Sequence, residues 1–261
     1  MVKHSNPGAR HLPRGLSILY EDRDILVVDK PAGLLTIATD AEKERTAYHH
    51  LTEYVRKGQA RSRNRIFIVH RLDRETSGVL VFAKTEEAKF TLQEHWDETE
   101  KVYLAVVPGH LTRPEGVIES YLAENTVHVV YSTNNPDKGK WSRTAYRVVC
   151  ETKEHSLLEV DLLTGRKHQI RVHLANIGHP VVGDKKYGQV PDSHGHLALH
   201  AYRLSFAHPF TGRRLQFEAK VPSHFYKLVG NIESAKKSVN LPDSANGETD
   251  RIETPPEPDQ N

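Results

Sequence analysis

Short apolar runs, rich in β-branched and aromatic residues, recur along the chain and are separated by turn-forming residues. Eight such runs predict β-strands, at residues 25–29, 67–69, 79–83, 103–107, 127–131, 142–150, 157–163 and 197–206. Clusters of Pro, Gly and Asn predict a tight turn at 30–33 and hairpin loops at 134–139 and 209–212. All the runs are strand-sized, so the sequence excludes a membrane-spanning helix.

Three amphipathic segments interrupt these strands. The first is predicted over 44–57 and ends at Gly58, and the second begins after Thr85 as a candidate N-cap. The third covers 168–177 and stops before Gly178. Because these helices do not alternate regularly with the strands, the order predicts an α+β fold with a mixed, mostly antiparallel sheet and flanking helices.

The two ends of the chain lack this periodicity. Residues 1–14 are basic and interrupted by proline, which predicts a flexible arm, and residues 234–261 predict a disordered, Pro-rich acidic tail. Residues 15–233 are expected to form one domain. The N-terminus has no apolar core of the signal-peptide kind, and the single cysteine, Cys150, cannot form an internal disulfide. We therefore expect a cytoplasmic protein.

Positive charge is concentrated in one part of the chain. The formal net charge is only +2, but seven Lys or Arg residues and one acidic residue lie between Arg56 and Arg74. Such a local excess attracts a polyanion, so the charge pattern favours a nucleic acid as the partner.

An unusually polar loop at residues 68–78 joins two predicted strands. Within it, Asp73 lies between Arg71 and Arg74, whose positive charges favour the ionised carboxylate. An ionised aspartate can act as a nucleophile or a base. On charge and position alone, an ion-paired loop residue is the alternative interpretation.

A second basic segment covers residues 163–174, where a Thr-Gly turn leads into the third predicted helix. Lys167 and Arg171 are four residues apart and therefore lie on one side of that helix. Basic groups at a helix start suit phosphate binding, whereas the alternative is a solvated, amphipathic helix face.

Together these segments resemble a known family. Residues 70–78 (HRLDRETSG) and 165–174 (GRKHQIRVHL) closely resemble the signature motifs of the RluA-type RNA pseudouridine synthases. Supporting matches follow the family's order at residues 20–33, 101–109, 178–188 and 197–201. The resemblance spans about residues 16–229 and implies the pseudouridine synthase fold with a central cleft. The S4-type RNA-binding domain that begins many family members is not expected here.

The resemblance also implies an activity: uridine within RNA becomes pseudouridine when the N1–C1′ bond breaks and uracil is rejoined through C5, with no cofactor. It implies that Asp73 is the catalytic aspartate and that Arg171 pairs with it. Tyr103 would pack on the target uracil, with proton transfer as a further possible role, and Arg71 would help to displace the target nucleotide. Whether the aspartate attacks uracil C6 or ribose C1′ stays open.

Charge suggests which residues contact RNA. Apart from Arg71, the candidates are Arg74, Arg56, Lys57, Arg61, Arg63 and Arg65, together with Arg166, Lys167 and His168 at the cleft entrance. The RNA, ribosomal or transfer, is left open. We expect a monomer because no coiled-coil pattern is present.

Two other functions compete with the isomerase. A noncatalytic RNA-binding or assembly protein of the same fold would bind RNA without chemistry. A metal-dependent hydrolase would use some of the 17 histidines, such as His194, His196 and His200. No Asp, Glu or Cys stands at ligand spacing around the first two, so we expect no functional metal.

Overall fold

The computed structural model describes residues 12–57, 59, 61–188 and 195–232. Its strands are β1 (Ser17–Glu21), β2 (Ile25–Lys30), β3 (Phe67–Ile68), β4 (Ser77–Ala83), β5 (Glu100–Pro108), β6 (Glu115–Glu124), β7 (Val130–Thr133), β8 (Lys140–Glu151), β9 (His155–Leu162), β10 (Leu199–Ala207) and β11 (Arg214–Glu218). Its helices are α1 (Ala47–Arg56), α2 (Glu86–Glu94), α3 (Gln169–Asn176), α4 (Ser223–Val229) and a 3-10 turn, η2 (Trp96–Glu98).

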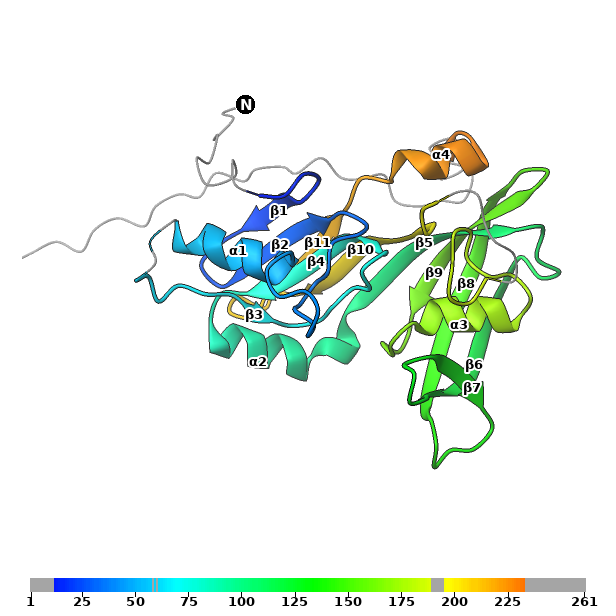
Figure 1. Ribbon diagram of the computed structural model, residues 1–261, viewed down its shortest axis with the longest axis horizontal. Helices are drawn as coiled ribbons and strands as arrows, with labels where there is room; N and C mark the ends of the chain where they lie inside the picture. The colour runs from blue at the N-terminus through cyan, green and yellow to red at the C-terminus, as the bar shows by residue number, and fades with distance from the viewer. Residues whose placement is uncertain (1–11, 58, 60, 189–194, 233–261) are drawn as a thin grey trace, which may run out of the picture.

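One mixed sheet runs the length of the molecule (Figure 1). Its strand order is β1-β2-β4-β10-β5-β9-β8-β6-β7, with β11 beside β10 and β3 beside β4. Among the described strands every pair is antiparallel except β4 with β10. The predicted fold class, α+β with a mixed and mostly antiparallel sheet, is therefore confirmed.

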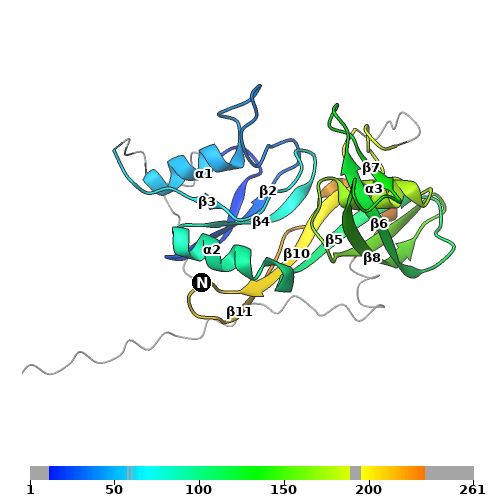
Figure 2. The same ribbon diagram turned by 90° about the horizontal axis from the view of Figure 1, so that it is seen from below.

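In the first half of the molecule, β2 and β4 are covered on both faces. Side chains alternate along a strand, so Leu26 and Val28 pack on the α1 side while Ile25 and Val27 pack on the α2 side. Figure 2 shows the two helices on opposite sides of these strands. Burial on both faces explains why β4 is an uninterrupted buried run from Ser77 to Ala83.

The two halves of the sheet meet where β4 and β10 pair in parallel over two residues. Gly78, with φ of +117°, lies against Ala201, and a Cβ at residue 78 would be only 2.1 Å from the Ala201 carbonyl oxygen. Only glycine allows this approach of one backbone to the other. Next to it, the Ser77 hydroxyl and His200 Nδ1 are 2.8 Å apart.

The helix boundaries differ slightly from the predicted ones. The first helix begins at Ala47, three residues later than predicted, because the Thr46 side chain caps it by accepting the His49 N–H. Lys57, in the left-handed conformation, ends it. The Thr85 cap is confirmed, since its side chain accepts the Ala88 N–H.

The prediction was wrong around the second half's edge strands. The run at 127–131 is mostly a turn, in which the Asn125 side chain accepts the Val127 and Val129 N–H groups, and β7 starts only at Val130. The loop at 134–139 does not close a hairpin, because β7 and β8 both pair with β6 on its opposite sides. The loop at 209–212 does join a hairpin, β10 with β11.

The elements that the sequence analysis missed are β6, β11 and α4, whereas β1 was indicated only by the family match at residues 20–33, which resembles an opening pair of strands. The strand β6 shows a clear alternation of exposed and less exposed residues from Glu115 to Ser120, which its sequence also carries. The predicted arm falls almost wholly, and the tail wholly, outside the described residues, although Leu12 already packs against the core. No helix in the described part is long and apolar enough to cross a membrane.

Candidate active site

Asp73 lies in the loop between β3 and β4, and hydrogen bonds from the segment after β2 fix the backbone of this loop. The Thr36 hydroxyl donates to the Leu72 carbonyl at 2.8 Å and accepts the Leu72 N–H at 3.2 Å. On the other side of Asp73, the Gly33 N–H donates to the Arg74 carbonyl at 2.8 Å. The backbone is thus fixed on both sides of Asp73, whose own side chain is 26% exposed.

A buried lysine reinforces the same loop. Lys30 is fully buried, and its Nζ donates to the carbonyls of Pro31 (3.0 Å), Leu34 (2.8 Å) and Arg74 (3.2 Å). Burial lowers the pKa of Lys30 to about 7. The side chain therefore ties the turn after β2 to the loop that carries Asp73.

Arg171, on α3, is clamped in front of Asp73. Its Nε and Nη2 each donate to one oxygen of Asp184 at 2.8 Å, while Nη1 donates to Asp73 Oδ2 at 3.2 Å. Asp184 is itself buried and accepts the N–H groups of Lys186 and Tyr187. A two-pronged contact of this kind fixes the plane of the guanidinium.

The charges of this cluster support one another. Burial disfavours a charged guanidinium, but the hydrogen bonds and charge of Asp184, and the charge of Asp73, raise the pKa of Arg171. Burial likewise disfavours the Asp184 carboxylate, yet Arg171 and two backbone N–H groups lower its pKa. Both groups are therefore ionised at neutral pH, and a permanent positive charge faces Asp73.

Tyr103 forms another wall of the same pocket. It lies on β5, opposite Ala201 on β10 and Val160 on β9, and is 9% exposed. Burial, and then the negative charge of Asp73, raise the pKa of Tyr103. Its phenol is therefore protonated at neutral pH. Because the phenolate is the form that would accept a proton, this environment disfavours a role as base. The side chain then offers a neutral aromatic ring and a hydroxyl group.

The three candidate catalytic residues line one pocket of about 310 Å³. Arg71, Arg166 and His168, predicted as RNA contacts, line it as well. A volume near the lower end of the range for small-molecule sites suits a single nucleobase rather than a large ligand. The structure thus brings together six of the residues that the sequence singled out.

His168 lies deeper in this pocket than the predicted position at its entrance. Its Nε2 is 3.7 Å from Asp73 Oδ2, and its Nδ1 is 2.7 Å from the Tyr187 hydroxyl. The Tyr187 ring also lies under Arg171, 5.1 Å from its Cζ.

The remaining basic candidates do not line the pocket. Arg74 donates from Nε to the Gly33 carbonyl, and Lys167 pairs with Glu124. Arg56 pairs with Glu53 at 3.0 Å, and Arg65 pairs with Glu86 at 3.4 Å. Arg65 also lies over the Phe67 ring, and Lys57, Arg61 and Arg63 belong to the same stretch of chain.

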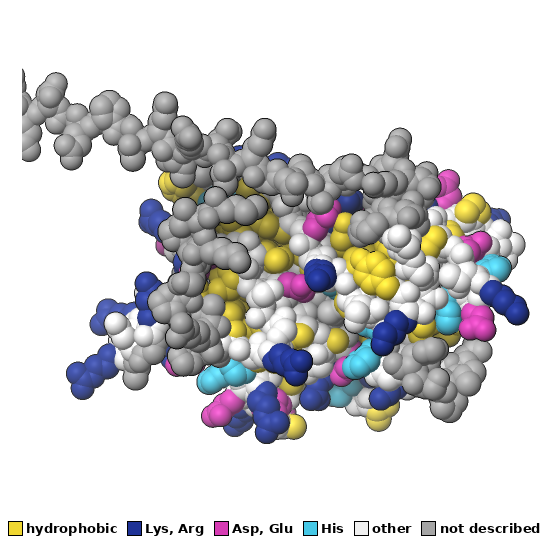
Figure 3. Space-filling model, turned by 90° about the horizontal axis from the view of Figure 1, so that it is seen from above, with side chains coloured by type: hydrophobic (Ala, Val, Ile, Leu, Met, Phe, Trp, Pro, Cys, Tyr) yellow, Lys and Arg dark blue, Asp and Glu magenta, His cyan; other side chains and the backbone are white. Residues whose placement is uncertain are grey.

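That stretch lies at the end of the molecule away from α3 (Figure 1). On the face shown in Figure 3, several dark blue Lys and Arg side chains gather at this end, and another group lies along the lower edge of the view. The segment from Arg56 to Arg65 is therefore separate from the pocket.

Four residues of the site escaped the sequence analysis. Asp184 and Tyr187 belong to the matched stretch at 178–188, but their partners are distant in sequence and no local pattern reveals them. Trp96 and Lys101 extend the pocket, with Lys101 Nζ donating to the Trp96 carbonyl at 3.1 Å. The position of Lys101 two residues before Tyr103, on the same face of β5, was a usable signal.

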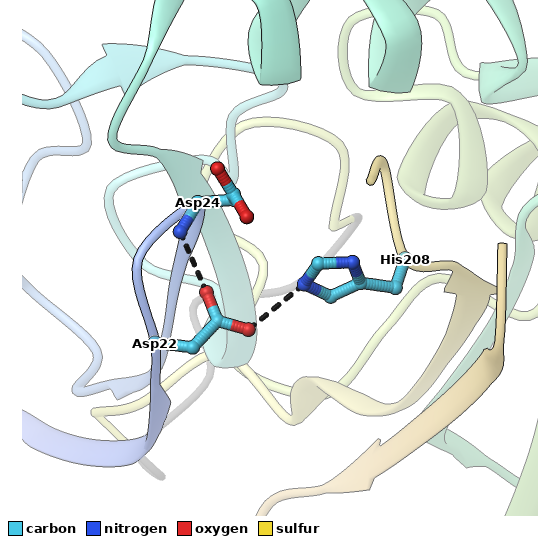
Figure 4. Close-up of side chains that lie close together, drawn as sticks. All are labelled: Asp22, Asp24 and His208. Atoms are coloured by element: carbon cyan, nitrogen blue, oxygen red, sulfur yellow. Dashed lines mark hydrogen bonds and ion pairs between the residues drawn. The ribbon is translucent and has the colours of Figure 1, made fainter. Parts of the chain in front are cut away.

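A possible metal site among the described residues consists of Asp22, Asp24 and His208, shown in Figure 4. The side chains of Asp22 and His208 are already engaged in hydrogen bonds, with His208 Nδ1 accepting the N–H groups of Phe210 and Thr211. Asp22 accepts the Tyr20 hydroxyl and the N–H groups of Asp24 and Ile25, and its Oδ2 is 2.8 Å from His208 Nε2. This group is a hydrogen-bonded fastening between the β1–β2 turn and the end of β10.

The histidines that raised the metal hypothesis are used differently. His200 pairs with the Ser77 hydroxyl, and the His196 ring lies 5.7 Å from the His224 ring. His194 lies outside the described residues.

Comparisons with known proteins agree with this geometry. Residues 24–176 match the family described as RNA pseudouridylate synthase. The "Ribosomal large subunit pseudouridine synthase D" of Nitrosomonas europaea is 36% identical over 241 residues, covering 88% of this chain and 67% of that protein. The protein of the same name from Zymomonas mobilis is 36% identical, covering 82% of this chain and 71% of its own length.

A solved structure shows the same fold. "Human RNA Pseudouridylate Synthase Domain Containing 4" superposes with a TM-score of 0.69 at 23% identity, covering 81% of this chain and 92% of that one. Fold and family match together define an RNA-modifying isomerase, which moves a base within one nucleotide. The chain belongs to the RluA-type RNA pseudouridine synthase family.

Proposed function

We propose that this pseudouridine synthase modifies uridines in ribosomal RNA of the large subunit, with Asp73 as the carboxylate that attacks the target nucleotide. The names of the two bacterial relatives support the choice of ribosomal RNA. The observation that carries the role of Asp73 is its 3.2 Å contact with Arg171 inside a nucleobase-sized pocket.

The reaction needs an ionised carboxylate that is nevertheless free to form a bond. Arg171 supplies a positive charge that Asp184 holds in place beside the Asp73 carboxylate, and Asp73 itself is only partly enclosed. In the overall change the N1–C1′ bond breaks, a C5–C1′ bond forms, C5 loses its proton and N1 gains one. Attack on C6 and attack on C1′ both use the same carboxylate.

Tyr103 is proposed to pack its neutral ring on the uracil rather than to accept a proton. The target base must leave its stack to enter the pocket, and an aromatic wall compensates for part of the stacking that the base loses. The raised pKa of the phenol supports this assignment.

Three cations are proposed to hold the RNA backbone at the pocket. Arg71, Lys101 and Arg166 line it, and within the described ranges none has an acidic side chain within ion-pair distance. Phosphates of the RNA would complete these contacts. The segment from Arg56 to Arg65 is proposed as a second, more distant phosphate-binding region.

The test is tritium release from RNA labelled at C5 of uridine, with ribosomal and transfer RNA as separate substrates. We expect release from large-subunit RNA by the wild type and none by Asp73→Asn. Asp137→Asn removes an exposed carboxylate outside the pocket and should behave as the wild type. Release from transfer RNA alone would overturn the proposed substrate, and equal release by wild type and Asp73→Asn would overturn the role of Asp73.

A noncatalytic RNA-binding role would give tight, salt-sensitive RNA binding without release from either fraction. We also propose that the protein is a cytoplasmic monomer. Light scattering during size-exclusion chromatography should then give 29.6 kDa, and a mass of twice that value would contradict it.

A further inference from the structure

A chain of three side chains leads from β7 into the pocket. The Val130 N–H donates to the Tyr187 hydroxyl oxygen at 3.1 Å, and that hydroxyl lies 2.7 Å from His168 Nδ1. The opposite ring nitrogen of His168, Nε2, faces Asp73 Oδ2 at 3.7 Å. The ring is 12% exposed, so neighbouring groups rather than water determine its orientation.

This arrangement assigns the proton on the ring. The Tyr187 oxygen already accepts the Val130 N–H, and its own proton has His168 Nδ1 as the acceptor within hydrogen-bond distance. Nδ1 is then the unprotonated nitrogen of a neutral ring, and Nε2 carries the hydrogen that points towards Asp73. Burial, together with the charges of Arg171, Lys186 and Lys167, lowers the pKa of His168 despite Asp73, so the ring is neutral at pH 7.

The two oxygens of Asp73 are consequently different. Arg171 Nη1 and His168 Nε2 both approach Oδ2, at 3.2 and 3.7 Å. Oδ1 has no hydrogen-bond partner in the part of the chain that the structure describes. The distance from Nε2 is about 0.7 Å longer than a hydrogen bond, and such contacts commonly shorten when substrate binds.

The backbone at His168 has an unusual conformation. Its φ of 54° and ψ of 14° are left-handed, which is uncommon for a residue other than glycine. Gln169 holds the strained turn, because its Oε1 accepts the Arg166 N–H and the Thr164 hydroxyl while its Nε2 donates to the Arg143 carbonyl. A strained residue held in this way beside a reactive group indicates a role in the site.

We infer that His168, oriented by Tyr187, is a positioning residue that holds Oδ2 of Asp73 together with Arg171 and so leaves Oδ1 as the oxygen that attacks the nucleotide. The inference rests on the proposed function of Asp73. It differs from the phosphate-contact role that the sequence suggested for His168, and the two roles predict different kinetics.

Two substitutions separate the ring nitrogens. His168→Asn tolerates the left-handed backbone and keeps an acceptor near the position of Nδ1, but it cannot reach Asp73. His168→Gln can place an amide N–H near the position of Nε2. We expect His168→Asn to lower kcat for tritium release at least 10-fold with KM changed less than twofold, and His168→Gln to recover most of that loss.

Tyr187→Phe removes the hydroxyl but keeps the ring under Arg171. It should lower kcat about threefold in the wild type and have no further effect in His168→Asn, because the two residues act in one chain. Thermal melting of each variant shows whether it is folded. A raised KM with unchanged kcat in His168→Asn would overturn the inference and favour an RNA contact.

A second measurement does not depend on turnover. In a ¹⁵N-labelled protein, NMR should show the neutral Nε2–H form of His168 at pH 7 in the wild type, and a greater proportion of the Nδ1–H form in Tyr187→Phe. A ring that carries its proton on Nδ1 in the wild type would overturn the inference. Failure of the proposed function looks different, since Asp73→Asn would then turn over RNA as the wild type does.

Discussion

The helices α1 and α3 are similar in length, but α3 buries more polar and charged side chains than α1 does. α1 turns apolar residues, such as Leu51 and Val55, towards the β2 and β4 strands. α3 buries Gln169, Arg171 and His173 alongside its apolar residues. His173 Nδ1 is 2.9 Å from the Thr144 hydroxyl, and its Nε2 is 3.1 Å from the Ser120 hydroxyl.

This difference suggests that α1 contributes mainly to the stability of the fold and α3 mainly to the geometry of the site. Burying apolar area stabilises the fold without defining a single orientation, whereas a buried polar group is tolerated only where its partners are correctly placed. Buried polar side chains on a helix therefore fix the position of each side chain while contributing less to the stability of the fold. α3 carries Arg171, which must meet Asp73 across the pocket, so the demand for precise placement falls on this helix.

The largest effect on activity is expected when the clamp behind Arg171 is weakened. Asp184→Asn removes the buried negative charge and half of the two-pronged contact, so Arg171 loses its fixed orientation. We expect kcat to fall about 100-fold and the free energy of unfolding to fall by about 3 kcal/mol. Tritium release and urea unfolding measure the two quantities, and near-normal turnover would show that other residues suffice to hold Arg171.

A matching substitution in α1 should lower the stability of the fold without lowering kcat. Leu51→Ala leaves a cavity in the packing of α1 and should lower the free energy of unfolding by about 3 kcal/mol. Because Leu51 does not line the pocket, kcat should stay within twofold of the wild type at a temperature where the variant is folded. A large loss of kcat in the folded variant would contradict this separation of roles.

The buried His173 of α3 should also make the stability of the fold sensitive to acid. Burial lowers the pKa of His173 to about 4, below its ordinary value of 6.5, so between these values the unfolded chain binds the proton more tightly. The free energy of unfolding therefore falls as the pH falls, by about 2 kcal/mol from this residue between pH 7 and pH 5. His173→Gln, which cannot titrate, should lose about 2 kcal/mol less than the wild type over that range in urea unfolding at each pH.

The smallest effect concerns RNA affinity. Replacing Arg71, which lines the pocket, should reduce the dependence of log K on log salt by about 0.7 if it contacts one phosphate of single-stranded RNA. Arg65→Gln is the comparison, because Arg65 pairs with Glu86 and lies outside the pocket. We expect Arg65→Gln to change this slope less than the substitution of Arg71 does. Binding titrations at several salt concentrations measure both slopes, and equal changes would contradict the expectation.

Local patterns predicted the parts of this molecule that depend on local physics. The fully buried runs at β2, β4 and β5 are unambiguous in sequence, and so is the Thr85 cap. The hairpin expected at 134–139 was wrong because a turn sequence does not say which strands pair. The β6 strand was missed although its sequence alternates, since charged residues and Gly116 interrupt its apolar character.

The site shows the same division. Asp73 and Arg171 were found through their motifs, but Asp184 and Tyr187 act through contacts with distant parts of the chain. Nothing in the residues near Asp184 indicates that its carboxylate will be buried against a guanidinium thirteen positions earlier. Likewise, the role of His168 depends on the hydroxyl of Tyr187, which only the folded chain brings to it.

The close approach at Gly78 has a consequence for how RNA can enter. Because the backbones of β4 and β10 touch there without side chains between them, the two halves of the sheet cannot swing apart like a hinge without separating paired strands. We therefore expect the catalytic scaffold to behave as a single rigid frame. Accommodation of a folded RNA would then fall to the RNA itself and to the loops around the pocket, so substrates that deform easily at the target uridine should be favoured.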